Sequence, residues 1–141
     1  MSSRTRILIV DDHASVRDGI RAFLEAKTDF IVCGEAQDGT KAIEEAKKLN
    51  PDLVILDLAL PMLNGVEAAS ILKTELPGVK IVAFTMYASE LGHAITAATR
   101  IDAVLPKSSS LRELTRTIRN LLGVPPPFQA STGSPQAAPC Q

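Results

Sequence analysis

Five short, almost uninterrupted apolar runs recur along the chain and constrain its fold more than any other feature. They are ILIV (7–10), FIVC (30–33), LVIL (53–56), KIVAF (80–84) and AVL (103–105). The runs are rich in β-branched residues and too continuous for strands that expose one face to water. Strands covered on both faces have this composition, which is typical of a parallel sheet.

Helical patterns separate these runs. Apolar residues recur at helical spacing over 16–24, 42–49, 66–76, 111–122 and, more weakly, 91–98. Ser110 and Glu113 are spaced as a capping box before the last pattern, and Gly123 follows it where a helix ends. This alternation predicts a doubly wound α/β fold, a five-stranded parallel sheet with helices on both faces.

Composition sets the domain limits. The chain has 141 residues, and residues 1–123 carry all the periodic segments. Residues 124–141 are uncharged and rich in Pro, Ser, Gln and Ala, which predicts a flexible tail or linker. The net charge of −1 gives no global field for nucleic acid or an anionic membrane.

We expect no export signal in the first residues of the sequence. Its first apolar run stops after four residues, too short for a signal peptide or a membrane span. Cys33 and Cys140 lack disulfide-framework or metal-site spacing. We therefore expect a cytoplasmic location.

Polar side chains follow four of the five runs. The first run ends in Asp11 and Asp12, the third in Asp57 and the fourth in Thr85, and Lys107 follows the fifth. Each residue alone is more often a turn residue, a helix cap or a solvated side chain. Because ligands of open α/β sheets bind outside the carboxyl ends of the strands, the set together predicts one functional site.

The chemistry of this set favours phosphoryl transfer. Three neighbouring carboxylates repel one another and need a cation, and oxygen-only ligands favour Mg²⁺. A Lys and a Thr are suited to hold the remaining oxygens of a phosphoryl group. Asp57 follows the central run and is the candidate nucleophile.

Four motifs carry a family resemblance. They are ILIVDDH (7–13), LVILDLALPMLNG (53–65), VAFT (82–85) and LPKSS (105–109). Over about 4–122 the chain resembles the receiver domain of response regulators in two-component signalling, closest to the branch usually fused to a helix-turn-helix DNA-binding domain. The resemblance implies a flavodoxin-like strand order 2-1-3-4-5 and a switch driven by Mg²⁺-dependent phosphorylation.

The resemblance also implies roles for the matching residues. Asp57 would be the phosphoacceptor, and Asp12 would bind Mg²⁺ directly, with Asp11 assisting through water. Asp57 and the backbone carbonyl of Ala59 would complete the protein ligands. Thr85 would hydrogen-bond the phosphoryl group.

Lys107 would pair with the phosphoryl group.

A sensor histidine kinase or a phosphotransfer protein would be the donor of the phosphoryl group, and the output partner is unknown. Direct DNA binding by this chain and membrane contact are not expected. The chain would not be a turnover enzyme, since it would catalyse only its own phosphoryl transfer and a slow autodephosphorylation.

The chain departs from the family pattern near Lys107. Val104 stands where the family usually has an aromatic switch residue, and Ala103 stands where Gly is common. Ser108 follows Lys107 where the family often has a cis proline, and Pro106 precedes it. The chemical residues are intact, but the usual route of signal transmission is altered.

Other functions fit less well. A haloacid-dehalogenase-type phosphatase would need an acid two residues after Asp57, where the chain has Ala59. A flavodoxin would need a hydroxyl-rich loop in place of DDHASVR, and no G-x-G-x-x-G motif is present. A receiver-like module that no longer takes phosphate remains the main alternative. His13 is a conceivable metal ligand, although its position favours a role at the start of a helix.

Overall fold

Parallel pairing joins the five apolar runs into one sheet. The computed structural model describes residues 4–86 and 101–124. The strands are β1 (Arg6–Val10), β2 (Ile31–Ala36), β3 (Leu53–Leu56), β4 (Lys80–Thr85) and β5 (Ala103–Pro106). Every pair is parallel and the order is β2-β1-β3-β4-β5, so the predicted fold class and strand order are confirmed.

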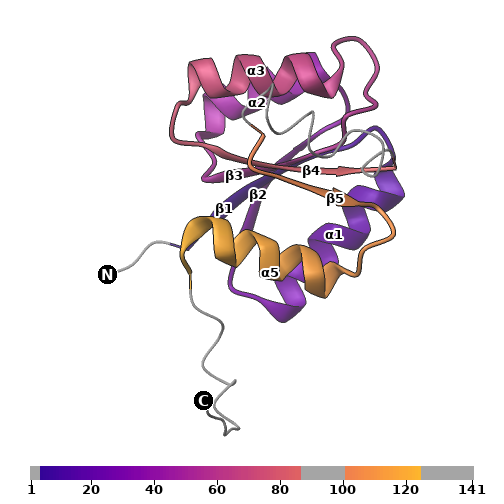
Figure 1. Cartoon of the computed structure of the whole chain (residues 1–141), viewed down its shortest axis with the longest axis vertical. Coiled ribbons are helices and arrows are strands. Elements are labelled where there is room, and N and C mark those ends of the chain that lie inside the picture. Colours follow the sequence, from indigo (N-terminus) through magenta and orange to yellow (C-terminus); the bar gives the residue numbers. More distant parts are fainter. Residues whose placement is uncertain (1–3, 87–100, 125–141) are drawn as a thin grey trace, which may run out of the picture.

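Helices cover both faces of the sheet (Figure 1). They are α1 (Ala14–Lys27), α2 (Gly39–Leu49), α3 (Gly65–Glu75) and α5 (Leu111–Leu122). The helix expected over 91–98 lies outside the described residues. Within the described ranges no helix combines the length and the apolar character that a membrane span requires.

Alternate residues of each strand face opposite layers. Leu8 and Val10 pack in a core beneath α2 and α3, whereas Ile7 and Ile9 pack in a second core beneath α1 and α5. All four side chains are buried. A continuous apolar strand is therefore required at this position, because neither face of β1 meets water beyond its first residue.

The last helix begins and ends where its sequence predicts. The Ser110 side chain accepts a hydrogen bond from the Glu113 backbone N–H. Gly123 ends the helix in the left-handed region, with φ of 67°. Glycine adopts this conformation without a Cβ clash, which makes it the usual residue at such an end.

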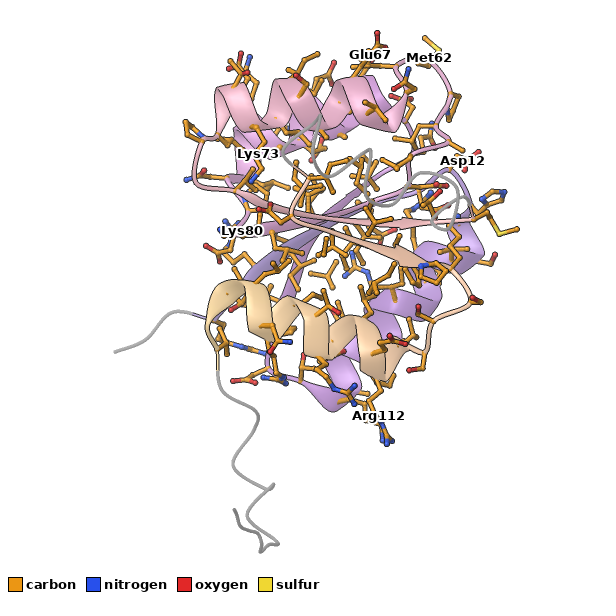
Figure 2. The ribbon with its side chains drawn as sticks, in the orientation of Figure 1. Asp12, Met62, Glu67, Lys73, Lys80 and Arg112 are labelled. Carbon is orange, nitrogen blue, oxygen red and sulfur yellow. The ribbon has the colours of Figure 1, made fainter. Side chains whose placement is uncertain are left out.

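A partly buried ion pair holds β5 against β4 at the end of the sheet where β4 begins. The Lys73 ammonium lies 2.8 Å from the Asp102 carboxylate and donates to the Val79 carbonyl at 2.7 Å. The same Asp102 oxygen accepts from the Ile81 N–H. Lys73 and Lys80 mark this end in Figure 2, opposite Asp12. These bonds fix where β5 starts, and β5 leads directly to Lys107.

Gly39 allows α2 to approach the loop that follows β3. A Cβ at this position would lie 2.0 Å from the Leu63 carbonyl oxygen, whereas a Cβ at Gly19 in the exposed face of α1 would meet nothing within 4 Å. Leu63 belongs to the loop between Asp57 and Gly65. Gly39 is thus a packing requirement for the segment that follows the third strand.

We predict opposite effects of alanine at these two glycines. Gly39→Ala should lower the free energy of unfolding by about 1–3 kcal/mol, because the loop backbone must move. Gly19→Ala should raise it by about 0.5–1 kcal/mol, because alanine is the better helix former. Urea denaturation measures both. Equal effects of the two substitutions would contradict the close approach at Gly39.

Candidate functional site

Backbone hydrogen bonds extend the strand ladders by one residue and fix the site residues. The bonds join Asp57 N–H to the Val10 carbonyl, Asp11 N–H to Ala36 and Lys107 N–H to Thr85, each with a 3.0 Å N···O distance. The three donors come from separate segments at the carboxyl end of the sheet. Figure 2 shows Asp12 at this same end.

The carboxylates predicted from the strand ends do meet. Asp11 and Asp57 are only 2% and 4% exposed, whereas Asp12 faces solvent. One ligand atom from each of Asp11, Asp12, His13 and Asp57 lies within 4.8 Å of the others. The arrangement therefore combines two buried carboxylates with one that is open to solvent.

Lys107 bridges the two buried carboxylates. Its ammonium nitrogen lies 2.7 Å from Asp11 Oδ2 and 3.0 Å from Asp57 Oδ2. Burial acts against the charge of Lys107, but hydrogen bonds and attraction from Asp11 and Asp57 outweigh it, so the pKa of Lys107 is raised. Lys107 is therefore charged at neutral pH.

The residues present fit Mg²⁺. Three carboxylates face one ammonium, which leaves an excess of negative charge that a divalent cation would neutralise. The carboxylate donors are hard oxygens, which Mg²⁺ prefers, and the exposure of Asp12 leaves room for bound water. Asp11, Asp12 and Asp57 are thus a suitable oxygen ligand set for this ion.

The other two predicted residues also lie at this site. The Ala59 N–H donates to Asp57 Oδ1 at 3.1 Å and so orients that carboxylate. Thr85 is fully buried at the end of β4. Metal binding by the Ala59 carbonyl and phosphate binding by the Thr85 hydroxyl stay predictions.

His13 has the predicted position and an additional contact. It precedes α1 as the N-cap residue, and its backbone N–H donates to Asp11 Oδ1 at 2.9 Å. Its ring Nδ1 also lies 3.1 Å from Asp11 Oδ1 and 3.1 Å from Asp12 Oδ1. The sequence pattern did not indicate this ring contact, because it depends on the side-chain rotamer.

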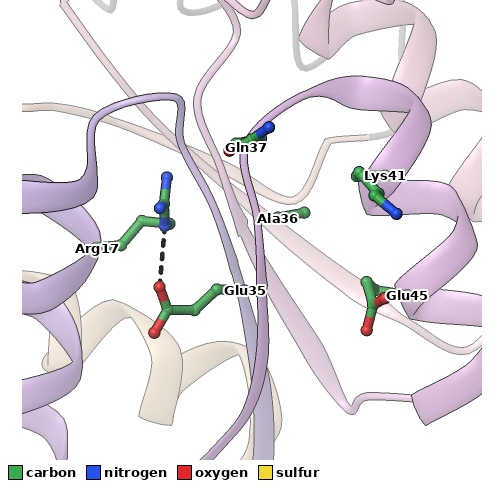
Figure 3. A pocket seen from close by; sticks show the side chains of 6 residues that line it. All are labelled: Arg17, Glu35, Ala36, Gln37, Lys41 and Glu45. Carbon is green, nitrogen blue, oxygen red and sulfur yellow. Dashed lines mark hydrogen bonds and ion pairs between the residues drawn. The ribbon is translucent and has the colours of Figure 1, made fainter.

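A polar network behind Asp11 was not predicted. The Arg17 guanidinium donates to the Asp11 backbone carbonyl and, through Nε, to Glu35 Oε1 at 2.9 Å. Arg21 Nε donates to the other Glu35 oxygen at 2.6 Å. Figure 3 shows Arg17 and Glu35 at one side of an open cavity of about 280 Å³, which Lys41 also lines. Glu35 lies on β2, the strand for which the sequence had predicted no polar site residue.

This network positions the loop that carries the acidic pair. Burial alone would raise the pKa of Glu35, but the hydrogen bonds and charges of Arg21 and Arg17 outweigh it and lower that pKa. Glu35 thus holds Arg17 in place, and Arg17 holds the backbone at Asp11.

The fold and the site together define a small α/β domain whose acidic cluster fits a divalent cation and the phosphorylation of an aspartate. The chain belongs to the response regulator receiver domain family, whose sequence model matches residues 7–119. The match covers most of the part of the chain that the structure describes.

Curated relatives and solved structures agree with this family. The response regulator protein VraR of Staphylococcus saprophyticus is 35% identical over 127 residues, which cover 89% of this chain and 60% of that protein. VraR of Staphylococcus aureus is 34% identical over 116 residues, or 81% of this chain and 54% of that protein. The chain therefore spans little more than half the length of these relatives.

Two solved structures illustrate the likeness of fold. A two-component response regulator of the LuxR family from an Aurantimonas species has a TM-score of 0.79 and 31% identity, with 86% of each chain covered. The response regulator domain of Thermotoga maritima CheB has a TM-score of 0.77 and 29% identity, with 88% of this chain and all of that domain covered.

The departures from the family pattern are visible in β5. Val104 pairs with Ala83 and packs, partly buried, against the core beneath α2 and α3. Ala103 packs against the opposite core. The described residues contain no cis peptide bond, and this includes the segment around Lys107. Val104 therefore occupies a packing position where the family usually places its switch ring.

We predict that Glu35 contributes pH-dependent stability. A carboxylate with a lowered pKa stabilises the fold above its ordinary pKa, and this contribution is lost as the pH falls below the ordinary value of 4.5. Glu35→Gln should therefore lower the free energy of unfolding by about 1 kcal/mol at pH 7, with a smaller difference toward pH 3. Urea denaturation at several pH values measures this.

Glu44→Gln is the matched control, because Glu44 is exposed and, among the residues that the structure describes, pairs only with Lys41 at 3.4 Å. Its effect should be close to zero at every pH. A Glu35→Gln effect that is the same at pH 7 and pH 3 would contradict the ion-pair account.

Proposed function

We propose that Asp57 accepts a phosphoryl group from the phosphohistidine of a sensor histidine kinase or a phosphotransfer protein. A carboxylate oxygen of Asp57 would form the new O–P bond while the P–N bond to the donor breaks. One observation carries the proposal. Asp57 directly follows the central strand β3 and is 4% exposed, one of its oxygens lies within 4.8 Å of ligand atoms of the other acidic groups, and Lys107 and the Ala59 N–H orient its carboxylate.

The metal ligands would divide into direct and indirect ones. Asp11 already accepts from the His13 N–H through Oδ1 and from Lys107 through Oδ2. Asp12 is the more exposed carboxylate. We therefore assign direct Mg²⁺ binding to Asp12, Asp57 and the Ala59 carbonyl, and a water-mediated role to Asp11.

Charge neutralisation would lower the barrier to transfer. Mg²⁺, when bound, supplies positive charge next to the phosphoryl oxygens, whose negative charge would otherwise repel Asp57. Lys107 would turn from Asp57 toward a phosphoryl oxygen, and it already lies 3.0 Å from that carboxylate. The Thr85 hydroxyl would donate to another phosphoryl oxygen.

The phosphorylated state would persist long enough to act as a signal. A turnover phosphatase places an acid–base residue near the nucleophile, which protonates the leaving group and then takes a proton from the water that hydrolyses the phosphoenzyme. Here the residue two positions after Asp57 is Ala59, whose methyl group transfers no proton. We therefore propose slow autodephosphorylation and a switching role rather than catalytic turnover.

The cellular location, the domain limits and the kind of partner are also proposals. We place the chain in the cytoplasm, which suits the free thiol of Cys33. We assign residues 1–123 to the receiver domain and 124–141 to a tail or linker, although Val124 still packs against the core beneath α1 and α5. With a net charge of −1, the chain is expected to bind proteins rather than DNA or membranes. The output partner is unknown.

We predict one phosphoryl group per chain on Asp57. Incubation with acetyl phosphate or phosphoramidate and Mg²⁺ should add the mass of a single phosphoryl group, measured by intact-mass spectrometry. Asp57→Asn should abolish the adduct, because an amide is not a phosphate acceptor. Asp18→Asn, on the exposed face of α1, is the matched control and should leave the adduct unchanged.

The same experiment distinguishes the proposed function from its main alternative. A receiver-like module that no longer takes phosphate would show no adduct in the wild-type chain under any of these conditions. An adduct that persists in Asp57→Asn would place the acceptor on another residue.

A further inference from the structure

His13 brings a nitrogen donor to an oxygen site. Its ring Nδ1 lies 3.1 Å from Asp12 Oδ1 and 3.1 Å from Asp11 Oδ1, although 63% of the side chain is exposed. The backbone bond from His13 N–H to Asp11 Oδ1 holds the residue at the start of α1. A side chain this exposed has open solvent around it, yet its ring nitrogen faces both carboxylates.

The spacing of these donors suits a shared metal ion. Two ligand atoms on adjacent corners of an octahedron, with bonds of about 2.1 Å, lie about 3.0 Å apart. Asp12 Oδ1 and His13 Nδ1 are 3.1 Å apart. Asp57, the other side chain that we assign as a direct Mg²⁺ ligand, belongs to the same cluster.

We propose that His13 is an additional metal ligand, which makes this site accept first-row transition dications such as Co²⁺ and Zn²⁺ more tightly than Mg²⁺. The inference rests on the proposed function, since it uses the same acidic site. Imidazole nitrogen binds these ions well, whereas Mg²⁺ keeps to oxygen ligands and water. The choice of ion would then decide whether the N-cap residue of α1 is tied to the site.

A simpler role for the ring makes a different prediction. If His13 only hydrogen-bonds the carboxylates, its removal should change the affinities for Mg²⁺ and for Co²⁺ in the same way. If His13 is a ligand, only the affinity for the transition ion should fall. His13→Asn distinguishes the two, because asparagine keeps a hydrogen-bond donor and a good helix N-cap but has no imidazole.

The test is a titration of the full chain, freed of metal by a chelator, with Mg²⁺ and separately with Co²⁺. Calorimetry gives the affinities, and the visible absorption of Co²⁺ reports its ligands. Wild type should bind Co²⁺ at least about tenfold more tightly than Mg²⁺. His13→Asn should weaken Co²⁺ binding by about tenfold or more and shift the Co²⁺ spectrum, with Mg²⁺ affinity nearly unchanged.

Two control variants complete the test. His93→Asn removes the only other histidine of the sequence and should change neither affinity. Asp12→Ala should weaken the binding of both ions, because it removes a ligand that both would use.

The outcomes separate the two proposals. If His13→Asn weakens both ions equally or neither, while Asp12→Ala weakens both, the His13 proposal is wrong and the acidic metal site stands. If Asp12→Ala changes neither affinity, the metal site of the proposed function is itself wrong.

Discussion

The contact between Lys107 and two buried carboxylates is the interaction on which the site depends. Asp11 and Asp57 are almost fully buried, and like charges at this separation repel strongly in a protein interior. The Lys107 ammonium contacts both at 2.7 and 3.0 Å and compensates part of their charge. The excess that remains is what suits the cluster to a divalent cation and, with that cation, to a phosphoryl group.

The fold supplies this arrangement through its parallel ladders. Asp11 and Asp57 are each one residue beyond a strand, and their backbone N–H groups still pair with neighbouring strands. Lys73 and Asp102 hold the start of β5 at the far end of the sheet. Close packing at Gly39 and the network of Arg17 with Glu35 then set the loops on either side of the acidic cluster.

The sequence predicted what depends on local pattern. Continuous apolar runs predicted the buried strands, and residues at the run ends predicted the shared edge where Asp57 and Lys107 meet. Three contacts were not predictable from the sequence. They are the double contact of Lys107, the position of the His13 ring and the pairing of Glu35 with Arg17. Each depends on side-chain direction between segments that are distant in the sequence or on a single rotamer, and hydrophobic periodicity carries no information on either.

Charge compensation at the site is tested most directly by the stability of Lys107→Met with and without Mg²⁺. In the absence of metal, the variant should lose about 3 kcal/mol of the free energy of unfolding, because two buried carboxylates lose their cation. Mg²⁺ should then stabilise Lys107→Met more than it stabilises the wild type, since the ion meets more uncompensated charge. A variant as stable as the wild type without metal, with no larger gain from Mg²⁺, would contradict the account.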